Sequence, residues 1–147
     1  MRTAIWASVV PIMFDVRKPW WRRWFGNRSE RAAARFLKGL GYRILVRNFV
    51  CPLGELDLIA LDQGCIVFVE VRSTGEGDSA RAAASVDDRK QKQLTKLAVH
   101  FLQAKRLLNQ AARFDVLAVS WPVDQSEPAI VHYQNAFEAV GRWQMFN

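Results

Sequence analysis

The stretch GELDLIALDQGCIVFVEVRS, residues 54–73, decides the fold class of this chain. Two apolar runs surround the dipeptide Gln63-Gly64, and this pattern predicts a β-hairpin with a tight turn in which glycine takes a positive φ. A two-residue loop also fixes the register, so that Asp62 faces Cys65 across the hairpin. The segment therefore predicts two paired, antiparallel strands.

The same register brings acidic side chains together. It places Asp57 opposite Glu70 and Glu55 opposite Arg72, and strand alternation then predicts all four on the same face as Ile59. Directly opposed residues have Cβ atoms about 5 Å apart. Two carboxylates at this distance repel each other unless a cation lies between them. The hairpin therefore predicts a cation site.

A hard divalent cation, Mg²⁺ or Mn²⁺, fits such a site because it takes carboxylate oxygens and keeps positions for water and phosphate. Bound there, the ion activates a water and neutralises charge that develops on phosphorus. The alternative is a cross-strand ion pair between Glu55 and Arg72, with Asp57 at a solvated strand end. The cysteines and histidines lack the spacing of a zinc site.

Helices and strands are expected on both sides of the hairpin. Asn27-x-x-Glu30 resembles a capping box and predicts a helix over residues 27–40, and Ser85-x-x-Asp88 predicts another over residues 85–108. The small residues of 73–85 predict a mobile loop. The remaining elements are strands over 42–50, 56–62, 65–71, 114–120 and 129–133 and a short terminal helix over 135–140. This order, αβββαββα, predicts an α/β fold with a central mixed sheet flanked by helices.

Length and charge predict the domain organisation and a class of partner. The 147 residues suffice for one domain, residues 28–147, after a basic Trp/Arg-rich extension over residues 1–27 that is expected to be poorly ordered. Lys and Arg number 21 against 14 acidic residues, a net charge of +7 that favours a polyanionic partner such as DNA. On the first helix, Arg31, Arg35 and Lys38 recur on the polar face and are expected to contact phosphates.

No apolar run approaches the roughly 18 residues that a membrane span needs, so no span is expected. Two cysteines without metal spacing are typical of a reducing compartment, the cytoplasm. Trp20, Trp21 and Trp24 are interleaved with arginines, which suits stacking on bases or a membrane interface. A membrane-surface protein therefore remains an alternative.

The hairpin and its neighbours resemble two known groups of proteins. The order of an acidic helix, then Asp, then Glu-x-Lys on a hairpin resembles the PD-(D/E)xK nucleases, which include archaeal Holliday-junction resolvases. More closely, residues 27–143 resemble the uncharacterised bacterial YraN family. The motifs that carry this resemblance are SERAAARFLKGLGYRILVRNF, GELDLIA, VFVEVR, RKQKQLTKLAVHFL, RFDVLAV and NAF.

The resemblance implies a restriction-endonuclease-like fold and roles for particular residues. Asp57 and Glu70 correspond to the metal carboxylates, and Glu30 to the acidic residue of the first helix, although Glu30 also suits capping of Asn27. Arg72 stands where the nuclease motif has lysine. Arginine stays charged and differs in geometry, so this departure puts catalysis in doubt.

Three further expectations concern residues downstream of the hairpin. Lys90 continues the apolar stripe of the second long helix, so an inward ammonium could replace the missing lysine, with Gln91 beside it. The alternative for Lys90 is an exposed side chain near the helix start. Arg113 and Asp115 are expected to have structural roles at the edge of a sheet.

The preferred function is therefore metal-dependent binding and cleavage of structured or branched DNA, with Asp57, Glu70, Arg72 and Lys90 at the catalytic site. The choice of branched DNA follows the resolvases by fold-level analogy alone. The alternative is a non-catalytic nucleic-acid-binding module on the same fold. A homodimer is compatible with the sequence.

Overall fold

The computed structural model describes residues 20–74 and 78–141, with side chains from residue 28 onward. Five strands form one sheet in the order β1-β2-β3-β4-β5, in which β3 and β4 are parallel and the other neighbours are antiparallel. The elements are α1 (Trp20–Gly39), β1 (Arg43–Cys51), β2 (Gly54–Asp62), β3 (Cys65–Thr74), α2 (Ser79–Ala84), α3 (Asp88–Ala104), β4 (Ala112–Ser120) and β5 (Ala129–Phe137).

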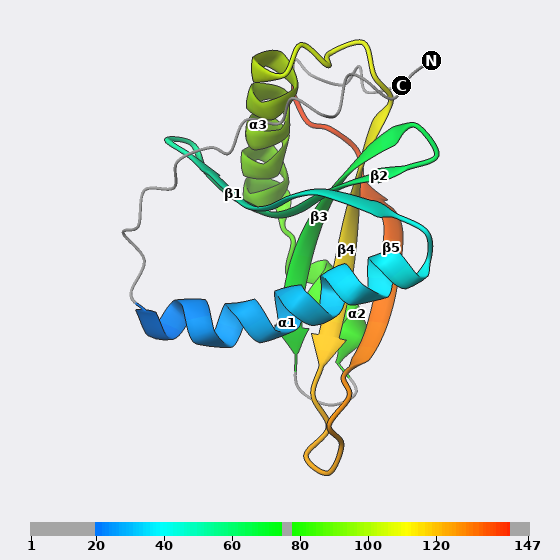
Figure 1. Cartoon of the computed structure of the whole chain (residues 1–147). Helices are drawn as coiled ribbons and strands as arrows, with labels where there is room; N and C mark the ends of the chain where they lie inside the picture. Colours follow the sequence, from blue (N-terminus) through cyan, green and yellow to red (C-terminus); the bar gives the residue numbers. More distant parts are fainter. Residues whose placement is uncertain (1–19, 75–77, 142–147) are drawn as a thin grey trace.

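Helices cover both faces of this sheet (Figure 1). On one face, α3 contributes Leu94, Leu97 and Phe101 to a core with Phe68 of β3. On the other face, α1 contributes Ala33, Ala34 and Leu37 to a core with Leu58 and Val69. The chain is thus an α/β protein with a mixed sheet between helices, consistent with the expected restriction-endonuclease-like fold.

The hairpin register is confirmed next to the turn, but the expected pairs of Asp57 with Glu70 and Glu55 with Arg72 are not formed. Gln63 and Gly64 both have positive φ, 47° and 84°, which matches a tight two-residue turn. Asp62 pairs with Cys65, and the pairing continues in step as far as Leu58 and Val69. The turn residues therefore determine this part of the sheet.

The expectation that Glu55, Asp57 and Ile59 share one face is wrong. Leu56 and Ile59 both belong to the core under α3, although an odd separation of three residues should place them on opposite faces of a regular strand. The alternation therefore breaks between them. Opposite this break, Asn48 of β1 takes a left-handed conformation with φ 51°, so both strands depart from regular geometry here.

The first helix begins earlier than expected. Helix α1 begins at Trp20, so Asn27 lies within the helix and does not cap it. The capping explanation for Glu30 therefore falls away. Residues 1–19, which make up most of the expected N-terminal extension, lie outside the described residues.

A short helix replaces part of the expected mobile loop. Helix α2 occupies Ser79–Ala84, and Ser85 is its C-terminal cap. The following helix, α3, is capped by Asp87, whose side chain accepts a hydrogen bond from the Lys90 backbone, and it ends at Ala104. Residues 75–77 lie outside the described part of the chain.

The expected terminal helix over residues 135–140 is wrong. Asn135, Ala136 and Phe137 continue strand β5, and the described residues after Phe137 form no helix. Phe137 stacks on Phe114 of β4 with ring centroids 4.6 Å apart, a contact that favours the strand. Among the described residues, no helix has the length and apolar character needed to cross a membrane.

Candidate functional site

The backbone pairing of β2 with β3 ends before the two strands themselves end. Pairing between the two strands runs from Asp62 and Cys65 to Leu58 and Val69. Beyond this point, the Asp57 carboxylate accepts a hydrogen bond from the Val71 backbone N–H, 2.8 Å from Oδ2. A side chain thus replaces the next backbone acceptor, and this places Asp57 between the two strands.

Three carboxylates meet beside this irregular segment. Ligand oxygens of Glu30, Glu55 and Asp57 all lie within 4.8 Å of one another, and each residue is half-buried. Glu30 comes from α1 and the other two from β2, so the cluster lies on the α1 side of the sheet. An all-oxygen donor set at this spacing suits a hard divalent cation, whose bonds to oxygen are about 2.0–2.6 Å long.

Glu70 lies on the opposite face of the sheet, toward α3. Its side chain is 6% exposed, and Oε1 lies 3.2 Å from Lys90 Nζ and 3.4 Å from Arg72 Nη2. Burial, together with the negative charge of Asp57, raises the pKa of Glu70 to about 7, although Lys90 and Arg72 act in the other direction. Glu70 is thus electrostatically coupled to the cluster through Asp57.

The observed cluster differs from the expected ligand set. Asp57, Glu70 and Glu30 were expected to hold the metal, with Glu55 as an accessory residue. The structure groups Glu55 with Glu30 and Asp57, whereas Glu70 contacts cationic side chains on the α3 side. The irregularity in β2 causes this exchange, because it turns Glu55 and Asp57 toward α1.

Arg72 is held against Glu70. The alternative in which Arg72 pairs across the hairpin with Glu55 differs from the observed ion pair, which joins Arg72 to its own strand neighbour. The Arg72 Nε atom is buried without a hydrogen-bond partner. A buried donor without an acceptor is destabilising, so arginine fits this position imperfectly.

Lys90 points into the site rather than to bulk solvent. Its backbone N–H is held by the Asp87 cap, in the first turn of α3, and its side chain is 26% exposed and reaches Glu70. Gln91 serves a different purpose, because its amide donates to the Val86 carbonyl and fixes the segment before the helix.

A row of exposed basic side chains follows α1. Arg28, Arg31, Arg35 and Lys38 are all exposed and recur at helical spacing, and Glu30 belongs to the same turns of α1 but projects from a less exposed side. Arg47 of β1 is also exposed and pairs with Leu58, the residue after Asp57. The sequence pattern gave no sign of Arg47, because only the pairing of β1 with β2 brings it near the cluster.

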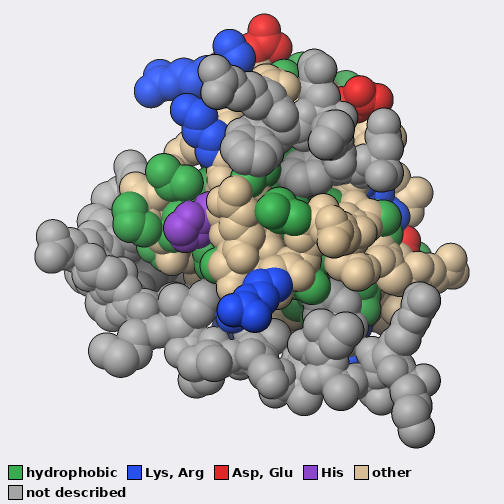
Figure 2. Space-filling view, turned by 90° about the horizontal axis from the view of Figure 1, so that it is seen from above, with side chains coloured by type: hydrophobic (Ala, Val, Ile, Leu, Met, Phe, Trp, Pro, Cys, Tyr) green, Lys and Arg blue, Asp and Glu red, His purple; other side chains and the backbone are tan. Residues whose placement is uncertain are grey.

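The face of the molecule that is seen from above has a mixed surface. There, charged side chains of both signs are scattered among neutral and hydrophobic ones, with a group of basic side chains at one side (Figure 2).

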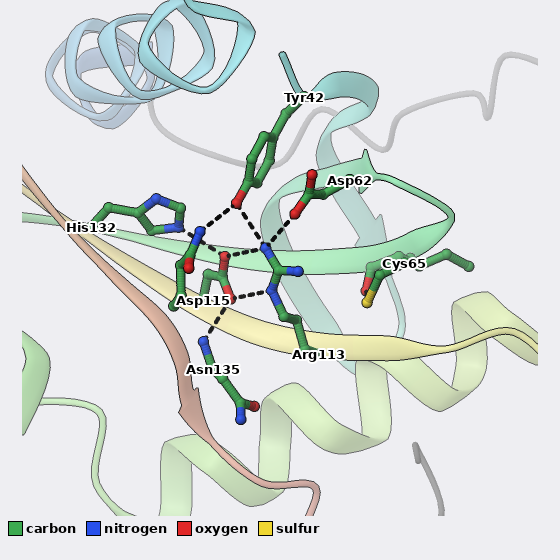
Figure 3. Close-up of polar contacts among 9 residues, drawn as sticks. Tyr42, Asp62, Cys65, Arg113, Asp115, His132 and Asn135 are labelled. Carbon is green, nitrogen blue, oxygen red and sulfur yellow. Dashed lines mark hydrogen bonds and ion pairs between the residues drawn. The ribbon is translucent and has the colours of Figure 1, made fainter. Parts of the chain in front are cut away.

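A second polar network lies further along the sheet (Figure 3). Asp115 is fully buried and accepts hydrogen bonds from Arg113 Nε, His132 Nε2 and the Asn135 backbone N–H. Burial opposes its ionisation, but these bonds outweigh burial and hold the pKa of Asp115 below its usual value. Arg113 also donates to Tyr42 and Asp62.

This network connects separate parts of the fold. Its members come from β4, β5, the end of β2 and the residue before β1, so it ties four parts of the fold together. The expectation that Arg113 and Asp115 lie at a sheet edge is wrong, because β4 lies between β3 and β5.

A five-stranded mixed sheet between helices defines an α/β protein, consistent with a restriction-endonuclease-like fold, and its carboxylate cluster is a candidate metal site. Residues 29–119 match the model of the uncharacterised protein family UPF0102, the YraN family, and the chain belongs to it.

Similar proteins cover most of the chain. A UPF0102 protein of Rhodopirellula baltica is 42% identical over 79% of this chain and 71% of its own length. One from Geotalea daltonii is 42% identical over 77% of this chain and 88% of its own, and one from Trichlorobacter lovleyi is 45% identical over 77% and 89%. Since the family is described as uncharacterised, its name implies no activity.

Proposed function

We propose that this protein is a metal-dependent nuclease that binds structured or branched DNA and cleaves its phosphodiester bonds. The observation that carries the proposal is the convergence of Glu30, Glu55 and Asp57 to within 4.8 Å, together with the buried pair of Glu70 and Lys90, in which Glu70 is electrostatically coupled to Asp57. A metal-dependent nuclease of this kind needs a cation site and a positioned proton-transfer group, and these residues would supply both.

Glu30, Glu55 and Asp57 would hold Mg²⁺ or Mn²⁺ through carboxylate oxygens. The bound ion would supply Lewis acidity at phosphorus and an activated water. On the protein side, the hydrogen bond from Val71 N–H fixes one Asp57 oxygen and thereby orients the carboxylate. The α1 row would hold the phosphate backbone over the cluster.

Lys90 takes the part of the lysine that the motif lacks. Its ammonium lies 3.2 Å from Glu70 Oε1, the same oxygen that Arg72 contacts from β3. A lysine held by a buried carboxylate donates hydrogen bonds to a water or phosphate oxygen at a fixed position. Arg72 would bind phosphate through its planar fork rather than titrate.

DNA is the proposed substrate because the row on α1 consists of basic side chains beside a carboxylate cluster, and because the whole chain carries a net charge of +7. Branched DNA remains an analogy with the resolvases. The cytoplasm is the proposed compartment, and the free thiols of Cys51 and Cys65 suit it.

A non-catalytic DNA-binding module is the second candidate. The observation in its favour is that Arg72 occupies the motif position and is already engaged with Glu70. In this case the acidic cluster serves only to bind a cation, and the basic row on α1 carries the function.

The decisive experiment separates cation binding from cleavage. Thermal unfolding with Mg²⁺, Mn²⁺ and a chelator tests the cation site, and a labelled four-way junction and a linear duplex test cleavage under the same conditions. We expect cation-dependent stabilisation and cleavage in the natural protein and neither in Asp57→Asn. The matched control is Asp124→Asn, which removes an exposed carboxylate from the β4–β5 loop.

The two candidates differ in outcome. Stabilisation by cation without cleavage of any DNA would support the binding module. If neither cation changes the unfolding temperature, the metal site itself is refuted, and the nuclease proposal falls with it.

A further inference from the structure

Arg28 and Trp121 form a contact that the proposed chemistry does not yet use. The guanidinium carbon of Arg28, on α1, lies 3.4 Å from the centroid of the Trp121 ring. Trp121 directly follows β4 and precedes Pro122, so it lies at the base of the β4–β5 loop. The contact thus joins residues 93 positions apart in the sequence, since 121 − 28 = 93.

Hydrogen bonds fix the Trp121 ring in turn. Its Nε1 donates to Ser29 Oγ at 3.0 Å, and Ser73 Oγ donates to the same oxygen at 2.6 Å. Ser29 is 3% exposed, so water does not compete strongly for these bonds. The chain of contacts runs from β3 through α1 to Trp121 and ends at the guanidinium of Arg28.

This series of contacts lies close in sequence to the carboxylates of the site. Ser73 lies three residues after Glu70 on β3, and Ser29 directly precedes Glu30 of the acidic cluster. The contacts that fix Arg28 therefore involve α1, which carries Glu30 of the cluster, and β3, which carries Glu70. A shift of α1 would move the guanidinium and Glu30 together.

Stacking leaves the binding edge of Arg28 available. A guanidinium that lies flat on an indole keeps its N–H donors in the plane, directed outward, where they match a phosphate bidentately. Arg28 is exposed and makes no ion pair within the described part of the chain. Because the ring already restricts the side chain, less conformational freedom is lost when a phosphate binds.

We propose that Arg28 is a phosphate-binding residue that grips the DNA backbone beside the acidic cluster, and that Trp121 is the positioning residue that holds it there. The inference rests on the proposed function for its ligand, a nucleic-acid phosphate. It distinguishes Arg28, the N-terminal member of the α1 row, as a side chain that is ordered before DNA binds, whereas the remaining row members are assigned from exposure and spacing alone.

The test measures DNA binding by the full chain without cleavage. A labelled linear duplex of about 20 base pairs is titrated in chelator, and the affinity is followed by anisotropy across a salt series. For Arg28→Ala we expect the slope of log affinity against log salt to fall by about one and the affinity to fall about fivefold.

Trp121 variants distinguish positioning from a purely structural contact. Trp121→Leu removes the stacking face, so we expect about a threefold loss of affinity, and no further loss when it is combined with Arg28→Ala. Trp121→Phe keeps an aromatic face and should lose less. Arg28→Lys should keep the salt slope, because it keeps the charge, but bind more weakly than the natural protein.

Arg106→Asn is the matched control. It removes an exposed positive charge beyond the end of α3, at a position with φ 58° that asparagine tolerates. Its salt slope should equal that of the natural protein. Thermal unfolding identifies any variant that fails to fold, and Arg28→Ala alone still decides the question if Trp121→Leu does not fold.

The outcomes separate this inference from the proposed function. An unchanged salt slope in Arg28→Ala, with DNA still bound, overturns the inference and leaves the nuclease proposal standing. Losses in Arg28→Ala and Trp121→Leu that simply add would overturn the role of Trp121. Binding through Arg28 without any cleavage supports the inference and removes the nuclease. A natural protein that binds no DNA overturns both.

Discussion

The ionisation of Glu70 should affect the stability of the folded protein. Its pKa is raised from 4.5 to about 7 by burial and by Asp57. Between these values the folded chain keeps a proton that the unfolded chain releases, so the stabilisation is complete below pH 4.5 and is lost as the pH rises through 7. The expected loss in the free energy of unfolding is at most about 3 kcal/mol.

Urea unfolding of the metal-free protein between pH 4.5 and pH 8 measures this loss. Glu70→Gln cannot ionise, so its stability should vary less over the same range. Glu127→Gln, at an exposed position in the β4–β5 loop, is the control and should follow the natural protein. Parallel profiles for Glu70→Gln and the natural protein would contradict the prediction.

Arg72→Lys should improve the site in two ways. It removes the buried Nε donor that has no acceptor, so stability should be unchanged or rise by about 1 kcal/mol. It also restores a compact donor next to Glu70, so Mg²⁺-dependent cleavage should increase. Thermal unfolding and the junction assay measure the two effects separately.

Variants of Lys90 test the proposed role of position 72 in a second way. Lys90 and Arg72 contact the same oxygen of Glu70, so their effects should not be independent. Lys90→Ala should reduce cleavage more in the natural background than beside Arg72→Lys. Folded Arg72→Lys protein that binds cation and DNA and still cuts nothing would leave the binding module as the better account.

At the scale of elements, the local sequence predicted the turn between β2 and β3 better than it predicted which face of the sheet each side chain of β2 occupies. Gln63-Gly64 specifies its own turn, and the register next to it followed correctly. The break in β2 was not predicted, because Glu55-Leu56-Asp57-Leu58 alternates as a regular strand would and the apolar run that follows suits either face. It coincides with the left-handed conformation of Asn48 in the neighbouring strand and with the hydrogen bond between Asp57 and Val71 of β3, which depend on strands beyond GELDLIA itself.

The predicted starts of the helices were wrong for a related reason. Asn27 offers a capping side chain, but α1 already runs through it from Trp20, in a segment without a cap signal at its start. Ser85 was expected to cap the start of the helix over residues 85–108. It is instead the C-terminal cap of α2, and Asp87 caps the start of α3. The cap of α3 was therefore placed two residues too early, because several nearby side chains can serve, whereas the start of α1 was placed seven residues too late.

The α1 row makes a prediction at this scale. Replacing Arg31, Arg35 and Lys38 together with alanine should lower the salt slope of DNA binding by about three, because each removes one phosphate contact. The control changes Arg89, Lys92 and Lys96, three exposed bases of α3 on the other face of the sheet. If the α3 variant shows the larger change, DNA docks on that face instead.

At the scale of the whole molecule, one sheet supports two polar centres with different tasks. Asp57 and Asp62 are five residues apart on β2, so the acidic cluster and the Arg113 network lie about 16 Å apart along the strand. The network has its hydrogen bonds satisfied by protein groups around Asp115, whereas the cluster gathers carboxylates that repel one another. The first arrangement stabilises the fold, and the second favours a ligand.

Asp115→Asn tests this division. The change leaves Arg113 without its buried carboxylate partner, so the free energy of unfolding should fall by about 3 kcal/mol. DNA affinity and cleavage per folded molecule should stay unchanged, since the network contacts none of the cluster residues by the bonds described. Urea unfolding gives the first quantity, and binding and cleavage at low temperature, where the variant is folded, give the others.

Combination with Asp57→Asn completes the test. Residues this far apart without shared partners change stability additively, so the double variant should show the sum of the two single effects within about 0.5 kcal/mol. Asp57→Asn should remove the stabilisation by Mg²⁺, and Asp115→Asn should keep it in full. If Asp115→Asn also loses the response to Mg²⁺, the two centres are coupled through β2, and the network belongs to the site rather than to the scaffold.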